Sequence, residues 1–229
     1  MVVVIPAAGE GSRFVNAGYE LPKPLIEARG VPMISRVAKM FPSDRRIVVC
    51  QKEHKGQIQA ASESEVIPIT KLTEGAALSV LCAEALVNDG DPVVVVNSDN
   101  IILGDDVAKF LNLAEQEGVD GSILTFKVDS GPWSYARVRG ERVVQVAEKT
   151  PISDNATAGV YYFKSWRILR TAVCRMIAAN DRFNGEFYLA PAYNYMIGAG
   201  MTVSNFTTLK QNFVSLGTPE DLERYNALA

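Results

Sequence analysis

Three runs of consecutive apolar residues place the strongest constraint on the fold of this chain. They span residues 2–6, Arg46–Cys50 and Val93–Asn97. A strand that reads as an unbroken apolar run is buried on both faces, as in a parallel sheet covered by helices on each side. The helical stretches that alternate with these runs are Met33–Met40, Ala76–Asn88 and Asp105–Glu117. This alternation predicts an α/β fold with a doubly wound, mostly parallel mixed sheet, whose ligand crevice lies at the carboxyl ends of the strands.

The second half of the chain changes to shorter strands in quick succession. Strands are expected at Gly121–Val128, Tyr135–Arg139, Val143–Ala147, Thr157–Phe163 and Thr202–Thr208. Helices are expected at Ser165–Ala179, Leu189–Ile197 and Pro219–Asn226. A turn at residues 139–141 indicates a hairpin, so antiparallel strands are expected to extend the core sheet.

Composition excludes several classes of protein. The 229 residues carry 23 Lys and Arg against 26 Asp and Glu, a net charge of −3, which gives no general attraction to nucleic acid or to an anionic membrane. The longest apolar runs fall far short of the roughly 20 residues of a membrane helix. The first residues are typical of a buried strand and not of a signal peptide. Cys50, Cys82 and Cys174 are expected to be reduced core thiols of a cytoplasmic protein.

A turn that could bind phosphate follows the first strand, which runs into Ala7-Ala8-Gly9-Glu10-Gly11-Ser12-Arg13-Phe14. Closely spaced glycines let backbone N–H groups approach a phosphate because no Cβ stands in the way. The dinucleotide fingerprint needs a third glycine where Phe14 stands, and the Gly-Lys-Ser/Thr of the ATPase loop is absent from the sequence. A tight turn that binds nothing is the alternative.

Two basic residues near this turn favour phosphate binding. Arg13 can donate to two phosphate oxygens at once, whereas Lys23 offers a compact charge suited to one phosphoryl group. Lys23 stands between Pro22 and Pro24, whose rings restrict the backbone on both flanks. The competing interpretation is an exposed lysine on an extended loop.

Gly9-x-Gly11-Ser12-Arg13-Phe14 followed by Pro22-Lys23-Pro24-Leu25 resembles the signature of the sugar-phosphate nucleotidyltransferases, which include thymidylyl-, cytidylyl- and guanylyltransferases acting on sugar 1-phosphates. The resemblance extends along the whole chain. Its later motifs are Asn97-Ser98-Asp99-Asn100, Ala147-Glu148-Lys149, Ala158-Gly159-Val160-Tyr161, Glu186-Phe187-Tyr188 and Leu216-Gly217-Thr218-Pro219-Glu220-Asp221-Leu222. It implies a Rossmann-like fold of the nucleotide-diphospho-sugar transferase type, with an antiparallel substrate lobe.

The resemblance also implies roles for individual residues. Arg13 and Lys23 would be catalytic, and Asp99 would coordinate a Mg²⁺ that bridges the nucleotide and the sugar phosphate. The nucleotide would contact Ala8, Gly9, Gly11, Ser12, Glu74, Gly75 and Ser98, and the acceptor would contact Lys149, Gly159 and Glu186. Residues 1–229 would form one domain, with a nucleotide-binding part at 1–118 and a mainly acceptor-binding part at 119–215.

Asp99 suits a metal ion on its own chemistry. The run Val93–Val96 delivers it to the carboxyl edge of the predicted sheet, and Mg²⁺ is commonly held by one or two carboxylates with phosphate oxygens and water. A helix cap or an Asx turn is the alternative. The family commonly has a second metal carboxylate just before the closing Gly-Thr, but Ser215 occupies that place. Either Asp99 holds the metal with water and phosphate oxygens, or another carboxylate substitutes, or the metal affinity is weaker. Asp221, in the last predicted helix, is expected to be a solvent-side or capping residue.

The base and the acceptor are less well defined by the sequence. Glu74 is expected to face the base, unless it only complements a helix dipole. Lys149 matches an acceptor phosphate, with an exposed ion pair as the alternative. Residues 133–136, 151–157, 184–188 and 193–194 resemble a capsule-associated cytidylyltransferase subgroup, some of whose members use phosphoglutamine. CTP is therefore slightly favoured, and the acceptor is left open.

The single histidine, His54, lies in a polar stretch and is expected on the surface. The lack of a catalytic histidine would be a problem for acyl transfer or hydrolysis, where a base must activate the nucleophile. A phosphate monoester needs no such base, because its second pKa of about 6 leaves the attacking oxygen charged at neutral pH.

We therefore predict a cytoplasmic, Mg²⁺-dependent nucleotidyltransferase that joins a nucleoside monophosphate from an NTP to a sugar 1-phosphate or similar small phosphorylated acceptor and releases pyrophosphate. Neither nucleic acid nor membrane is expected as a partner, and a homo-oligomer is left open. The alternatives are a cytidylyltransferase for a non-sugar phosphate such as phosphoglutamine, a dinucleotide-binding oxidoreductase, and a non-catalytic protein that binds nucleotide or sugar nucleotide.

Overall fold

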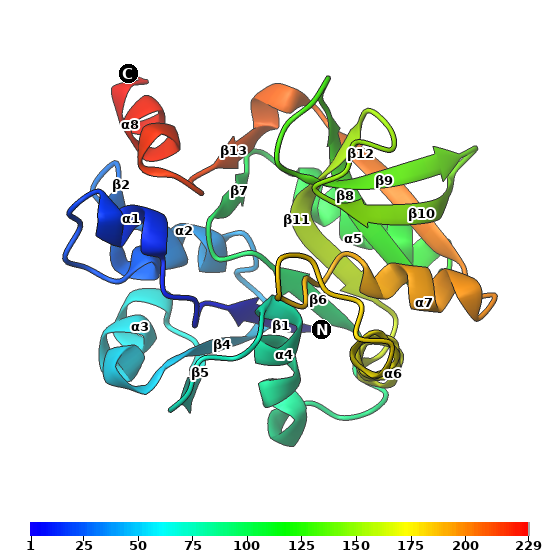
Figure 1. The fold of residues 1–229 in the computed structure, drawn as a ribbon, viewed down its shortest axis with the longest axis horizontal. Coiled ribbons are helices and arrows are strands. Elements are labelled where there is room, and N and C mark those ends of the chain that lie inside the picture. The colour runs from blue at the N-terminus through cyan, green and yellow to red at the C-terminus, as the bar shows by residue number, and fades with distance from the viewer. Residues whose placement is uncertain (229) are drawn as a thin grey trace.

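A nine-stranded mixed sheet runs through the whole molecule in the computed structural model, which describes residues 1–228 (Figure 1). In sheet order its strands are β5 (Glu65–Ile69), β4 (Arg45–Gln51), β1 (Val2–Pro6), β6 (Val93–Val96), β11 (Asn155–Phe163), β8 (Gly121–Lys127), β12 (Val203–Thr208), β10 (Arg142–Glu148) and β9 (Ser134–Arg139). The four strands from β5 to β6 are parallel, and β11 then runs antiparallel to β6 and β8. Beyond β8, β12 is parallel to it, and the β9–β10 hairpin closes the far edge.

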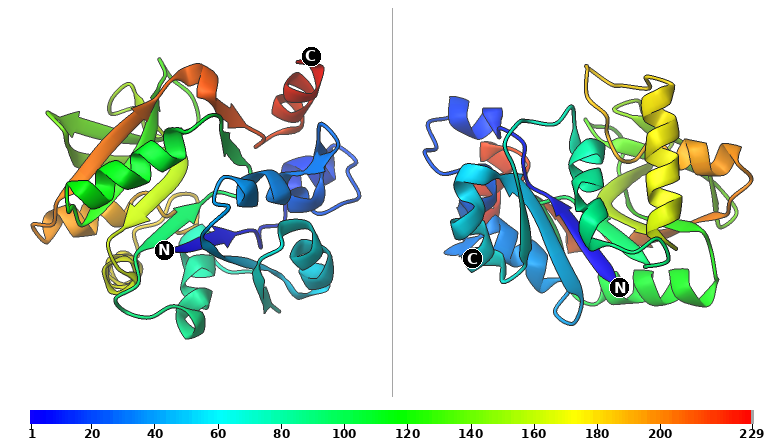
Figure 2. Two further views of the ribbon diagram at one scale, coloured as in Figure 1. Left: turned by 180° about the vertical axis from the view of Figure 1, so that it is seen from behind. Right: turned by 90° about the horizontal axis from the view of Figure 1, so that it is seen from below.

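Helices cover both faces of this sheet. They are α1 (Ser12–Asn16), α2 (Met33–Lys39), α3 (Lys55–Ser62), α4 (Ala76–Leu81), α5 (Asp106–Gln116), α6 (Trp166–Ala178), α7 (Ala192–Gly198) and α8 (Pro219–Ala227). Four short 3₁₀ turns accompany them, η1 (Lys23–Leu25), η2 (Lys52–His54), η3 (Cys82–Leu86) and η4 (Lys210–Asn212). Figure 1 is seen from the side of α4, α6 and α7, and the left view of Figure 2 from the side of α2 and α5.

The apolar strands feed two separate cores, one on each side of the sheet. Val4 and Val95 pack with α4, α6 and α7, whereas Ile5 and Val94 pack with α2, α3 and α5. Successive residues of a strand point to opposite faces, so an unbroken apolar run supplies both cores at once. This is the physical basis of the predicted doubly wound arrangement, which is confirmed.

Two small sheets lie outside the main one and position the last part of the chain. The strands β7 (Asn100–Ile102) and β13 (Phe213–Ser215) pair antiparallel, and β2 (Glu27–Ala28) pairs with β3 (Val31–Pro32). The β7–β13 pair carries the chain back to the end of β6, and α8 then packs beside β2. Thr218 begins α8 as a cap, because its side chain accepts from the Asp221 N–H.

Several elements differ from the sequence expectation. The helix predicted over residues 76–88 is α-helical only to Leu81 and then tightens into η3, a common way for a helix to end. The helix predicted from Leu189 begins at Ala192, directly after Pro191. The strands β5, β7 and β13 were not predicted. Pro68 lies within β5, which is tolerated because β5 is the edge strand of the sheet.

The three cysteines do not share one environment. Cys50 is buried on β4, and burial raises the pKa of its thiol to about 11. Cys82 is half-buried, whereas Cys174 is exposed on α6, so the expectation of a core thiol at 174 was wrong. The apolar neighbours of Cys174 in sequence face the sheet, and the helical twist turns Cys174 itself to solvent. Among residues 1–228, none of the helices has the length and apolar character needed to span a membrane.

Candidate active site

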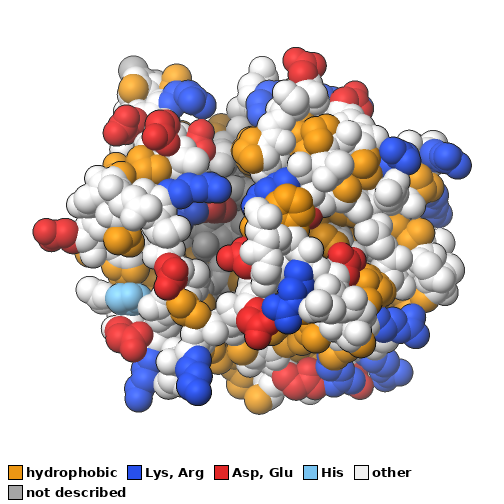
Figure 3. All heavy atoms as spheres, viewed as in Figure 1, with side chains coloured by type: hydrophobic (Ala, Val, Ile, Leu, Met, Phe, Trp, Pro, Cys, Tyr) orange, Lys and Arg blue, Asp and Glu red, His pale blue; other side chains and the backbone are white. Residues whose placement is uncertain are grey.

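Two adjoining pockets open where the strands β1 and β6 end. The larger, of about 440 Å³, is lined mainly by residues 6–14, by Lys23 and by residues between 72 and 79. The smaller, of about 300 Å³, is lined by side chains from β7, β9, β10 and β11 and by the closing segment, residues 215–221. Arg13, Ala76, Tyr188 and Gly217 line both pockets. Figure 3 shows the surface hollowed between the two halves of the molecule, with acidic and basic side chains around the hollow.

The glycine turn forms one wall of the larger pocket. Ala8, Gly9, Gly11 and Ser12 all line it, as the sequence predicts. Gly11 has a φ of +65°, and a methyl group on its α-carbon would lie 3.0 Å from the Lys23 Cβ. The turn therefore needs glycine at position 11, both for its backbone conformation and for the close approach of Lys23.

Lys23 lines the larger pocket and pairs with Asp99, which lines the smaller one. Its Nζ is 2.5 Å from Asp99 Oδ2 and 3.4 Å from the Gly217 carbonyl oxygen, and it stands 5.5 Å from the centre of the Phe14 ring. The Lys23 side chain is 19% exposed and that of Asp99 22%, so the ion pair is shielded but open to ligand. The structure thus brings together the two residues predicted to carry catalysis and metal binding, which are 76 positions apart.

Asp99 is held in place by backbone contacts on both sides. The Asn97 N–H donates to the Gly159 carbonyl, and the Leu216 N–H donates to the carbonyl of Asp99 itself. These bonds tie the end of β6 to β11 and to the closing segment. The Asp99 carboxylate pairs with Lys23 and caps no helix, which argues against the structural alternative for this residue.

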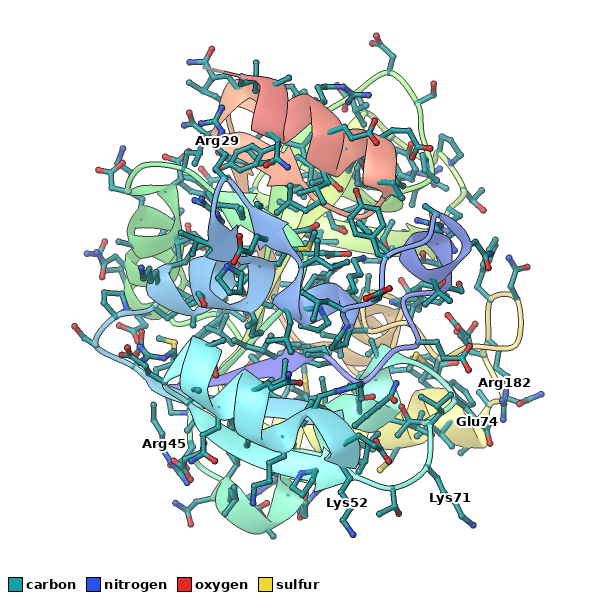
Figure 4. All side chains as sticks on the ribbon, turned by 90° about the vertical axis from the view of Figure 1, so that its left-hand side faces the viewer. Arg29, Arg45, Lys52, Lys71, Glu74 and Arg182 are labelled. Atoms are coloured by element: carbon teal, nitrogen blue, oxygen red, sulfur yellow. The ribbon has the colours of Figure 1, made fainter. Side chains whose placement is uncertain are left out.

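Glu74 and Gly75 are adjacent in sequence, but only Gly75 lines a pocket. Gly75 lines the larger pocket with a φ of +121°, and a methyl group there would meet the Phe187 backbone at 2.5 Å. The Glu74 side chain forms an ion pair with Arg182, and the two are labelled together in Figure 4. Glu74 lines neither pocket, because Arg182 holds its carboxylate at the outer rim.

Lys149 enters the smaller pocket from the end of β10. Its Nζ donates to the Tyr188 hydroxyl at 2.7 Å and lies 4.6 Å and 5.2 Å from the ring centres of Tyr188 and Phe183. The backbone of Lys149 has a φ of +50°, which is uncommon for a residue with a side chain. Such conformations are found at ligand sites, where the surrounding structure enforces them. The alternative of an exposed ion pair is not what the structure shows.

Glu148 is a feature of the smaller pocket that sequence reasoning missed. Its side chain is buried, with an exposed fraction of 8%, and it accepts a hydrogen bond from Ser134. Burial raises the pKa of the Glu148 carboxyl. Beside it, Thr157 and Tyr161 share a hydrogen bond of 2.9 Å. Val146 is buried and position 148, two residues later on the same strand, lies on the same face, which is the signal that could have identified it.

The other predicted residues fall in varied places. Ser98 lines the larger pocket. Glu186, predicted on the acceptor side, also lines the larger pocket beside Tyr188. Gly159 lines neither pocket. It lies behind Asn100, which lines the smaller pocket, and a methyl group on Gly159 would meet the Asn100 amide nitrogen at 2.3 Å. His54 is half-buried in η2 and belongs to neither pocket.

Asp221 lies only partly where it was expected. Its backbone N–H is bound by Thr218, but its carboxylate lines the smaller pocket and is only 24% exposed. Of the two alternatives given for Asp221, the solvent-side one was wrong, whereas the capping one agrees with its place in the first turn of α8 beside the Thr218 cap. The first turn of α8 therefore faces the site.

A family model described as nucleotidyl transferase matches residues 2–226. The chain belongs to this family. It is 24% identical over 204 residues to the bifunctional protein GlmU of Thermotoga petrophila, covering 85% of this chain and 44% of GlmU. It is 27% identical over 213 residues to the mannose-1-phosphate guanylyltransferase RfbM of Salmonella typhimurium, covering 82% of this chain and 44% of RfbM. The chain spans less than half the length of these curated relatives.

Solved structures of nucleotidyl transferase relatives share the fold over nearly the whole chain. A nucleoside-diphosphate-sugar pyrophosphorylase from Vibrio cholerae RC9 is 24% identical, with a TM-score of 0.82 and a coverage of 99% of both chains. The inositol-1-phosphate CTP transferase from T. maritima is 15% identical, with a TM-score of 0.79 and coverages of 98% of this chain and 93% of that one. The family and the fold predicted from the sequence are thereby confirmed, and the capsule-associated subgroup stays a prediction.

Proposed function

We propose that this chain transfers a nucleoside monophosphate from an NTP to a sugar 1-phosphate or a similar small phosphorylated acceptor and releases pyrophosphate. The observation that carries the proposal is the Lys23–Asp99 pair at the junction of the two pockets. We call the larger pocket the nucleotide pocket and the smaller one the acceptor pocket. An NTP and an acceptor bound in them would meet beside the Lys23–Asp99 pair, where an acceptor phosphate oxygen can attack the α-phosphorus, so that the nucleoside monophosphate joins the acceptor and pyrophosphate leaves.

Backbone amides and two cations would bind the triphosphate. The turn at Gly9–Gly11 supplies N–H groups that can donate to the phosphates. Arg13 lines both pockets, so its guanidinium can pair with the triphosphate before the reaction and with the departing pyrophosphate after it. Lys23 would neutralise the α-phosphate, where the attacking and leaving oxygens are in line. Phosphoryl transfer depends mainly on such positioning and charge neutralisation.

The acceptor phosphate would be held by Lys149. Tyr188 keeps the Lys149 ammonium in the pocket and leaves its other N–H groups to donate. A phosphate monoester is already charged at neutral pH, so the site needs no general base and His54 has no part in the reaction. Buried Glu148 offers an acceptor for a hydroxyl group of the substrate.

The site also fits a divalent cation. Asp99 Oδ2 is a hard oxygen donor that already faces a cation, the Lys23 ammonium, and it would hold Mg²⁺ beside the phosphates. Bound there, Mg²⁺ would neutralise charge on the α-phosphate and on the acceptor.

A pyrophosphate-release screen tests the proposal. CTP, UTP, dTTP, GTP and ATP are each incubated with Mg²⁺ and with sugar 1-phosphates, phosphoglutamine or phosphocholine. We expect pyrophosphate only when the matching nucleotide and acceptor are both present, and we expect CTP to be the nucleotide. Release without any acceptor would indicate a hydrolase, and binding of nucleotide with no release for any pair would indicate a non-catalytic protein.

A further inference from the structure

The closing segment contains a cradle of three oxygen atoms around Gly217. A methyl group built on the Gly217 α-carbon would lie 3.2 Å from Ser215 Oγ, 3.7 Å from Asp99 Oδ2 and 4.0 Å from Asp221 Oδ2. The three oxygens come from β13, from the end of β6 and from the first turn of α8. Only glycine leaves this space open, and the space is lined by hard oxygen donors.

Each of these side chains is held in position by its backbone. Ser215 pairs with Asn100 across the β7–β13 ladder, and the Ser215 Oγ accepts from the Gly217 N–H at 3.2 Å. The Thr218 cap fixes the start of α8 and so the position of Asp221. The donors are thus carried by two strand ends and a capped helix start, which is the kind of rigid support that a binding site needs.

The charges around the cradle favour a cation. Asp99 and Asp221 bring two carboxylates to it, and Lys23 is the cation that already lies against Asp99. Among the described residues 1–228, Arg224 is the one basic side chain paired with Asp221, through Oδ1 at 3.5 Å, and Arg224 is 73% exposed. An exposed pair at this distance is weak, so Oδ2 stays available to the cradle.

We propose that Asp221 is the second carboxylate of the divalent-cation site, with Ser215 Oγ as its polar neighbour, in place of an aspartate at position 215. The proposal rests on the proposed function. Two carboxylates and a hydroxyl match the hard oxygen ligands that Mg²⁺ takes, with phosphate and water completing its shell. Asp221 reaches from α8 to supply the charge that Ser215 lacks.

The competing role for Asp221 is purely structural. An acidic residue in the first turn of a helix stabilises it by complementing the helix dipole, by about 0.3–1 kcal/mol. The two roles differ in what a longer side chain does. Glutamate at 221 keeps the charge at the helix start but moves the carboxylate oxygens by one methylene group away from the cradle.

Binding of Mn²⁺ alone to the full chain, measured by electron paramagnetic resonance, tests the proposal without any turnover. We expect Asp99→Asn, Asp221→Asn and Asp221→Glu each to weaken Mn²⁺ binding by about 10- to 100-fold. The matched control is Glu223→Gln, which removes a charge from an exposed position of the same helix and should leave Mn²⁺ binding unchanged. Adding Ser215→Asp to Asp221→Asn should restore the affinity. Thermal unfolding shows whether each variant is folded.

The outcomes separate the two proposals. If Asp99→Asn weakens Mn²⁺ binding while Asp221→Asn and Asp221→Glu do not, the metal site stands and Asp221 is overturned as its ligand. If none of the three variants changes Mn²⁺ binding, the cation is held elsewhere, and the metal part of the proposed function fails with it. If Asp221→Asn is unfolded, Asp221→Glu decides alone, because it retains the charge at the helix start.

Discussion

The two pockets adjoin at the Lys23–Asp99 pair but are built in different ways. Most of the nucleotide pocket comes from one continuous turn, residues 6–14, and from the start of α4. The acceptor pocket takes one or two side chains from each of four strands, and others from the Tyr188 loop and from the closing segment. Backbone amides of consecutive residues form the first, and side chains that only the fold brings together form the second. A phosphate chain is common to all NTPs, whereas acceptors differ, so the pocket made of side chains is the one suited to change specificity.

The largest expected effect tests the point where the pockets meet. Lys23→Ala should lower kcat about 10²- to 10³-fold, because the α-phosphate loses its positive partner. The fold should persist, since the Lys23 side chain ends at the pocket. Pyrophosphate release measures the rate, and Lys52→Ala, on the exposed edge labelled in Figure 4, is the control. Wild-type rates in Lys23→Ala would remove this residue from the reaction.

A second variant asks whether the two pockets act separately. Lys149→Ala should reduce kcat/KM for the acceptor about 10- to 100-fold, the cost of a hydrogen bond to a charged group. The KM for the nucleotide should not change, because Lys149 lines only the acceptor pocket. Lys127→Ala, which removes an exposed ion pair with Asp154, should be neutral. Equal changes in both KM values would mean that the pockets are not distinct.

The rim of the nucleotide pocket gives a smaller effect. Glu74→Ala and Arg182→Ala should each raise the KM for the nucleotide at most about fivefold, because exposed ion pairs contribute about 0–1 kcal/mol. The two variants and their double mutant should behave alike if Glu74 acts only through Arg182. A much larger effect of Glu74→Ala than of Arg182→Ala would restore the role of base contact predicted from the sequence.

The smallest expected effect concerns stability and pH at the acceptor pocket. Burial raises the pKa of the Glu148 carboxyl above its ordinary value of 4.5, so the folded state favours the protonated acid. Below pH 4.5 the carboxyl is neutral in both states, and its charge costs stability as the pH rises through the folded pKa. Glu148→Gln should therefore match the wild-type Tm near pH 4 and exceed it at pH 8, by calorimetry. A lower Tm at pH 8 would show that the charge is compensated in the fold.

The contrast between the pockets also explains what the sequence could predict. The glycine turn, Arg13 and Lys23 are close together in the chain, and their spacing alone indicated phosphate binding. Asp99 was found because an apolar run ends just before it. These residues lie where the parallel strands end, and the burial of those strands on both faces follows from their apolar, β-branched sequences.

Side chains whose neighbours are distant in sequence were the ones whose surroundings could not be predicted. Asp221 was given only a solvent-side or capping place because the helical pattern of α8 shows which residues pack on its own core and not what faces its first turn. Glu74 was assigned to the base because Arg182, 108 positions later, could not be foreseen as its partner. Glu148 was passed over because its burial depends on β9 and β11 lying across it.

The closing segment returns to the start of the chain, and this has a bearing on biosynthesis. The Gly217 carbonyl meets the ammonium group of a lysine translated 194 codons earlier. The Lys23 side of the centre is therefore made long before residues 215–221, and a nascent chain holds an incomplete centre until that segment has been translated. Under the proposed function, a product that stops before residue 215 should be inactive however well its earlier strands have folded.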